Sequence, residues 1–205
     1  MQTETTQTAT SPDIAETIGR AGNTVKEGIV TSLKGMNEIE AEIVSLVRST
    51  VSNGLRASGA VATEGIAITK DVMKGAIQAT EEVGNGLLLS TKSVAKGVIM
   101  GVTDVGGDVI GAARETVKAA VKGASEVGAD IGMVAKRAVD GVIEAGVETG
   151  GNVLEIGKSA TTGAIEAAGT IGNTAVNTMR DLMLNALAGV KQVAGAALPH
   201  AEKTA

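Results

Sequence analysis

The chain has 205 residues, a formal net charge of −5 at pH 7, and no Phe, Tyr, Trp or Cys. These absences exclude disulfides and cysteine-based zinc sites, and they leave nucleic-acid binding without a stacking platform or a basic patch. A hydrophobic content of 43% at low net charge argues against disorder in the assembled state. Any core must therefore be built from Val, Ile, Leu, Met and Ala, together with some of the 28 glycines.

The N-terminal residues 1–11 are polar, and we expect them to be disordered and to contain no signal peptide. A helix is predicted to begin at Pro12, because Ser11 can cap its first turn and Glu16 follows at the acidic end. The helical repeat region extends over residues 12–197, and residues 198–205 are a polar tail.

A 22-residue repeat runs through this region without gaps and is clearest over residues 75–184. One column of the repeat, the basic column, comprises Lys26, Arg48, Lys70, Lys92, Arg114, Lys136, Lys158 and Arg180. An acidic column comprises Glu16, Glu38, Glu82, Asp104, Glu126 and Glu148. A glycine column comprises Gly84, Gly106, Gly128, Gly150 and Gly172. We expect the basic column to form one margin of an apolar sector, and the glycines to be close-packing contacts.

The repeat length is twice eleven, and an eleven-residue repeat gives about 3.67 residues per helical turn. The sequence therefore predicts an all-α protein with a long amphipathic helix or helices. The apolar stripe along such a helix would run nearly straight or form a right-handed supercoil. Such helices are compatible with an elongated bundle or filament. An apolar column, expected to face a surface or a partner, comprises Ile77, Ile99, Val121, Ile143 and Ile165. Helical hairpins with turns at Gly106-Gly107, Gly150-Gly151, Asn53-Gly54 and Asn85-Gly86 are the alternative. Long helices are favoured, because we expect a turn to disturb the phase of the basic column.

Interior glycines create an energetic problem for a continuous helix, because each costs about 1 kcal/mol relative to alanine. An isolated helix should therefore be only partly formed in water. Burial of the apolar sector on a surface, or close approach of another helix over the small residues, would supply the missing stabilisation.

Thr24-Val25-Lys26-Glu27-Gly28-Ile29 resembles the lysine-threonine-lysine-glutamate-glycine-valine core of the synuclein eleven-residue repeats. Residues 141–176 are similar to the eleven-residue repeat region of perilipins, and bacterial phasins are a further analogue. This resemblance of pattern covers most of residues 14–196 and implies a helix that coats membranes, lipid droplets or polyester granules. The basic column departs from synucleins, which carry more lysine in each repeat, and the negative net charge weakens binding to anionic lipid.

Residues with catalytic potential are isolated in the sequence. The single histidine, His200, lies in the tail, and Glu81-Glu82 has no pocket that would shift a pKa for acid–base work. We therefore expect no enzyme activity, and no catalytic, cofactor or metal site. The apolar stretches 83–91 and 182–190 are shorter than the roughly 20 residues that span a bilayer. The chain is expected to be cytoplasmic, with no transmembrane span and no nucleic-acid partner.

Three functions are compatible with this pattern. The first is a non-catalytic coat, in which the apolar sector lies on a lipid or storage-granule surface and basic side chains snorkel at its margin. The second is self-assembly into a helical bundle or filament packed through Gly and Ala faces, with the charged columns setting the register. The third is a stress-protective chain that folds on drying or crowding.

Overall fold

The computed structural model describes residues 20, 22–28, 39–58, 64–83 and 87–197, and its regular structure is entirely helical. After a helical segment at residues 22–28, the helices are α2 (Ile39–Ser58), α3 (Glu64–Val83), α4 (Leu87–Thr103), α5 (Val109–Glu126), α6 (Ile131–Glu148), α7 (Val153–Ile171) and α8 (Asn173–Ala197). The predicted all-α class is therefore confirmed. The predicted N-terminus 1–11, the cap at Ser11-Pro12 and the tail 198–205 lie outside the described residues.

Each unit of the sequence repeat is one helix followed by one tight turn. Four successive helices, α4 to α7, begin at Leu87, Val109, Ile131 and Val153, so that their starts follow the period of the repeat. The preference for a continuous helix was wrong, and the hairpin alternative is the observed one. The phase of the basic column survives because the turn recurs at the same place after α4, α5 and α6. Of the other two candidate turns, Asn53-Gly54 lies inside α2, and Asn85-Gly86 lies outside the described residues.

Glycines of the glycine column end the helices. Gly106, Gly128 and Gly150 have φ of +68°, +70° and +70°, a left-handed conformation that favours glycine. At the first turn the Gly107 N–H donates to the Val102 carbonyl and the Gly106 N–H to the Thr103 carbonyl, both at 3.0 Å, as in a Schellman motif. A Cβ added at any of the three would meet nothing within 4 Å.

The expectation that this column consists of close-packing contacts was therefore wrong. Gly172, with φ of +152°, also ends a helix and also has open space where a Cβ would lie. Gly84 lies outside the described residues. Because these glycines stand at helix ends, they do not carry the helix-interior penalty that the sequence predicted for them.

Each turn closes on a polar residue that caps the next helix. Asp108, Asp130 and Asn152 recur at the period of the repeat, and each accepts hydrogen bonds from backbone N–H groups of the first helical turn. The Asp108 carboxylate accepts from the Gly111 N–H at 2.9 Å. Such caps satisfy N–H groups that have no partner within the helix.

Replacing Asp108 with alanine is expected to lower the free energy of unfolding by about 1 kcal/mol, because the Gly111 N–H loses its acceptor. Asp108→Asn should retain most of that stability, since its amide oxygen still accepts. Urea unfolding followed by circular dichroism measures both variants. No loss of stability for Asp108→Ala would show that the cap does not stabilise α5.

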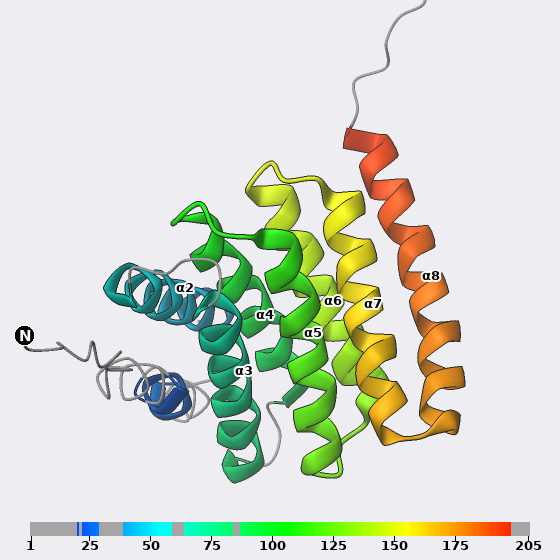
Figure 1. Cartoon of the computed structure of the whole chain (residues 1–205), viewed down its shortest axis with the longest axis horizontal. Helices are drawn as coiled ribbons and strands as arrows, with labels where there is room; N and C mark the ends of the chain where they lie inside the picture. Colours follow the sequence, from blue (N-terminus) through cyan, green and yellow to red (C-terminus); the bar gives the residue numbers. More distant parts are fainter. Residues whose placement is uncertain (1–19, 21, 29–38, 59–63, 84–86, 198–205) are drawn as a thin grey trace, which may run out of the picture.

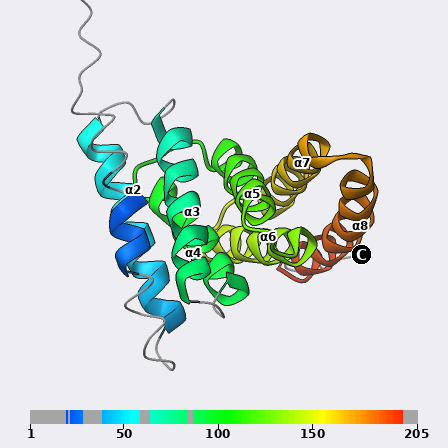
Figure 2. The same cartoon turned by 90° about the horizontal axis from the view of Figure 1, so that it is seen from below.

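The helices alternate between two layers. The short turns make successive helices antiparallel, and most helices pack most extensively against the second helix along the chain. Thus α2, α4 and α6 form one layer and α3, α5 and α7 the other, in a row that starts at residues 22–28 and ends at α8 (Figures 1 and 2). The last helix departs from this pattern, because α8 packs mainly on α7 and only weakly on α6.

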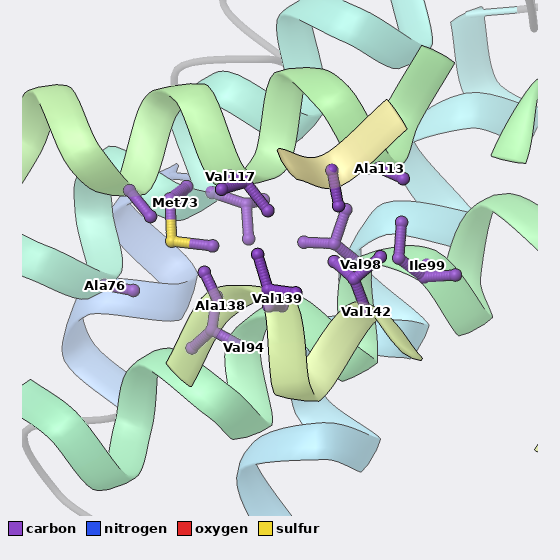
Figure 3. Close-up of a cluster of buried hydrophobic side chains, with 14 of the residues drawn as sticks. Met73, Ala76, Val94, Val98, Ile99, Ala113, Val117, Ala138, Val139 and Val142 are labelled. Atoms are coloured by element: carbon purple, nitrogen blue, oxygen red, sulfur yellow. The ribbon is translucent and has the colours of Figure 1, made fainter. Parts of the chain in front are cut away.

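Small aliphatic side chains fill the space between the layers. Figure 3 shows methyl groups from α3, α4, α5 and α6 meeting in one cluster. Its labelled members are Met73, Ala76, Val94, Val98, Ile99, Ala113, Val117, Ala138, Val139 and Val142, all at most 2% exposed. Helices that present so many alanines and glycines can approach closely, so a core without aromatic side chains still excludes water.

One buried hydroxyl in this core lacks a partner. Thr69 of α3 is 0% exposed, and its Oγ1 makes no hydrogen bond. Thr69→Val is expected to raise the free energy of unfolding by about 1 kcal/mol, because it removes a buried unsatisfied polar group at nearly constant volume. Thr116 is equally buried, but its Oγ1 donates to the Ala112 carbonyl at 2.7 Å. Thr116→Val should therefore give no gain, and a gain of equal size in both variants would contradict this account.

Candidate interaction surfaces

Members of the basic column pair with carboxylates two helices further along the chain. Arg48 of α2 binds Asp104, which follows α4, in a two-pronged ion pair with Nε–Oδ2 of 2.6 Å and Nη2–Oδ1 of 2.7 Å. The hydrogen bonds and charge of Arg48 hold the pKa of Asp104 below its usual value. Since Asp104 belongs to the acidic column, the two columns meet here across one layer.

The same link recurs between α4 and α6. The Lys92 Nζ lies 2.6 Å from one carboxylate oxygen of Glu144, and the Lys96 Nζ lies 2.8 Å from the other. Lys96 also donates to Glu148, a member of the acidic column, at 2.5 Å. In the other layer, Arg114 of α5 pairs with Glu166 of α7, which Lys118 approaches at 3.4 Å. We call this set of links between a helix and its second neighbour the ion-pair ladder.

The ladder stops at the C-terminal end of the array. Within the described chain, the basic-column residues that are exposed and form no ion pair are Lys70, Lys136, Lys158 and Arg180. Lys26 is half-buried and has an interaction partner. The basic column therefore forms ion pairs between helices at Arg48, Lys92 and Arg114, and it leaves exposed charges without an ion pair at Lys70 on α3 as well as at Lys136, Lys158 and Arg180 towards the end of the array.

The ladder should make stability depend on pH. Hydrogen bonds from Lys92 and Lys96 hold the pKa of Glu144 below its ordinary value of 4.5. Its stabilisation is therefore present above that pH and is lost as the pH falls through the folded-state pKa. We expect the melting temperature of the protein to fall below about pH 4.5, and to fall less steeply in Glu144→Gln.

A half-buried carboxylate of the same helix, Asp140, provides a control of opposite sign. Burial raises the pKa of Asp140, although Lys136, Arg137 and Lys92 oppose the shift. Its charge therefore costs stability as the pH rises through the raised value. Asp140→Asn should abolish that loss and leave the acid-side fall unchanged. Differential scanning calorimetry across the pH range measures both, and identical profiles for the two variants would contradict the assignment.

Residues of the apolar column lie mostly inside the fold. Ile77, Ile99 and Val121 are at most 2% exposed, and Ile143 and Ile165 are half-buried and packed against the core. The expectation that this column faces an external surface or a partner was therefore wrong for the folded chain. The reason is that the two layers cover each other's apolar sectors.

The glycines that do pack closely belong to other columns. A Cβ on Gly97 or Gly101 of α4 would lie 2.8 Å from the Val44 carbonyl oxygen or 2.7 Å from the Arg48 carbonyl oxygen of α2. Gly141 of α6 and Gly163 of α7 have the same relation to the carbonyls of Lys92 and Arg114. A pair of glycines one helical turn apart, such as Gly97 and Gly101, is a signal for such contacts.

A groove opens where α8 leaves the layer pattern. It has a volume of about 690 Å³ and lies between the start of α6, the turn after α7 and the first half of α8. Its walls include Ile131, Met133, Lys136, Ile171 and Leu182. Met133 is 47% exposed and Ile171 40% exposed, which makes this groove the place where large apolar side chains of several helices reach the surface together. We call it the α6–α8 groove.

The described residues contain no cluster of three or more His, Asp or Glu side chains that could hold a metal ion. Within the same part of the chain, every helix is too short or too polar to cross a bilayer. The fold and its surfaces therefore define an all-helical repeat protein whose notable features are contacts between helices.

No protein-family model matches the sequence, and no curated protein matches it. Among solved structures, the chain is similar to the crystal structure of a de novo designed helical repeat protein, DHR7, with a TM-score of 0.49 and 19% sequence identity. That similarity covers 89% of this chain and 95% of the designed chain. So distant a similarity identifies neither a family nor a function.

Proposed function

We propose that the protein is a non-catalytic structural protein that self-assembles by packing its helices against those of other copies. The observation that carries this proposal is the open end of the array. Inside the chain, the basic column of α2 and α4 is covered by the second helix along. At α6 that cover is incomplete, because α8 packs mainly on α7.

Sedimentation velocity of the purified protein over a wide concentration range tests the proposal. A self-assembling array should remain helical at every concentration and should shift to larger species as the concentration rises. A chain that is folded and monomeric at all concentrations would overturn the proposal. Circular dichroism at the same concentrations separates assembly of a folded chain from folding on assembly.

Coating of a lipid or granule surface is the second candidate, and the aromatic-free core favours it. The helices bury their apolar sectors against Val, Ala and Gly side chains, without the large aromatic contacts that dominate most cores. An apolar surface could therefore replace the partner layer at modest loss of packing. The array must open for this to happen, because Ile77, Ile99 and Val121 are inaccessible in the closed fold.

Neutral lipid droplets and phospholipid vesicles distinguish the two candidates. A coat protein should bind them with loss of the packed tertiary structure but not of helix, and binding should speed proteolysis of the turns. A self-assembling array should leave the lipid fraction empty and keep its turns protected. Binding without any opening of the array would contradict the coat mechanism, since the apolar column would still be buried.

A further inference from the structure

We propose that the α6–α8 groove binds the N-terminal repeat of a second copy, so that copies join head to tail. This inference rests on the proposed self-assembly and specifies its contact. The groove combines exposed apolar side chains, Met133 and Ile171, with two charges, those of Asp130, which caps α6, and of Lys136, which forms no ion pair with any residue that the structure describes. The occupant should therefore be an amphipathic helix with a carboxylate beside its apolar face.

The groove continues an interface that the chain already uses twice. Arg48, Lys92 and Lys136 occupy the same repeat position on α2, α4 and α6, the three helices of one layer. The first two each meet a carboxylate on or directly after the next helix of the layer, Asp104 for Arg48 and Glu144 for Lys92. Lys136 is the third member of this series and lacks such a carboxylate among the described residues.

The sequence of α8 is not suited to complete the series. At the positions that correspond to Glu144 and Asp104, counted from Lys136, α8 carries Ala188 and Gln192, so that it has no carboxylate at either place. Lys136, whose charge acts within its own helix on Asp140, thus meets no carboxylate of α8 at these two places. A helix from elsewhere that carries the acidic column would restore the missing link.

The N-terminal part of the chain has the complementary charge. Residues 1–47 contain seven acidic and three basic residues, and Glu16 and Glu38 belong to the acidic column in the same register as Asp104 and Glu148. In the sequence, Glu16 and Glu38 come before Arg48, the first residue of the ion-pair ladder. In a head-to-tail array they would take the places next to Lys136 that α8 leaves without a carboxylate.

The contact should be made between copies, not within one. Residues 22–28 lie at the opposite end of the row of helices from α8 in both views (Figures 1 and 2). Residues 22–28 of a chain are thus remote from its own groove. Joining its two unlike ends gives a heterologous contact, which produces rings or open filaments.

Sedimentation velocity of full-length charge variants tests the contact. Lys136→Glu and the double variant Glu16→Lys/Glu38→Lys should each require at least about tenfold higher concentration to assemble, because like charges would face each other. An equimolar mixture of the two should associate again, since the groove of each variant is complementary to the N-terminal repeat of the other. Lys70→Glu, an exposed change at the same column position on α3, should assemble as the unaltered chain does.

A further variant tests the apolar wall of the groove without changing any charge. Met133 is 47% exposed, so Met133→Ser should leave the melting temperature nearly unchanged while weakening assembly through the apolar wall of the groove. If the unaltered chain is monomeric at all concentrations, both self-assembly and this contact are wrong. If it assembles and all groove variants assemble equally well, self-assembly stands and this contact is wrong. A lower melting temperature for the Met133 variant, with unchanged assembly, would show that Met133 packs within its own chain, which also overturns the proposal.

Discussion

Replacing Gly163 with alanine is expected to lower the free energy of unfolding by about 3 kcal/mol. The new Cβ would collide with the carbonyl oxygen of Arg114 on α5, and this backbone atom cannot move aside as a side-chain terminus can. α7 would have to separate from α5 along the most extensive helix pair of the fold. The result is opposite in sign to helix propensity, because glycine to alanine stabilises an isolated helix by about 1 kcal/mol.

Gly169, in the same helix, is the matched control. It is exposed, and a Cβ added there would meet nothing within 4 Å. Gly169→Ala should therefore raise the free energy of unfolding by roughly 0.5–1 kcal/mol through helix propensity alone. Urea unfolding of the two single variants measures the difference directly. Equal stabilisation by both substitutions would show that α5 and α7 do not approach as closely as the structure places them.

The period of the repeat and the all-helical class were readable from the sequence, but the meaning of the period was not. An amphipathic helix of eleven-residue units and a helix-plus-turn unit both preserve the phase of a column such as Lys92, Arg114 and Lys136. The distinguishing signal was local. Each member of the glycine column from Gly106 to Gly150 is followed, after one intervening residue, by Asp108, Asp130 or Asn152.

That pairing of a C-terminal glycine with an N-cap residue is the signature of one helix ending and the next beginning. The spacing of the glycine column alone does not distinguish residues that end helices from packing contacts, because the distinction lies in the neighbouring residues. The true packing glycines, such as Gly97 and Gly101, were visible as a pair one helical turn apart on α4. Their role depends on which helix lies opposite, and that information is not local.

The ladder and the groove depend on the layering of the helices. Pairing between a helix and its second neighbour follows from alternation between two layers, which no local pattern specifies. The sequence predicted that the charged columns set the register of an assembly, and within one chain Arg48 of the basic column pairs with Asp104 of the acidic column. It gave no sign that α8 would leave its layer, because the basic column continues unbroken to Arg180.

The second prediction with a large expected effect concerns the stability lost when side chains of the apolar column are shortened. Ile99 is 0% exposed and packs between the layers, so Ile99→Ala is expected to lower the free energy of unfolding by about 3 kcal/mol in the free protein. Ile143 occupies the same column but is only half-buried, so that Ile143→Ala should lose clearly less. Urea unfolding in the absence of lipid, polymer or any partner measures both substitutions.

The comparison separates a folded array from a helix that gains order only on a surface. If the column faced an external surface, as the sequence suggested, neither substitution would change the stability of the free chain, and both would weaken surface binding alike. In the layered fold the losses are graded by burial, because a cavity forms only where neighbouring atoms surround the deleted groups. Equal and negligible effects at Ile99 and Ile143 would therefore rule out the layered core, and with it the open end on which head-to-tail assembly depends.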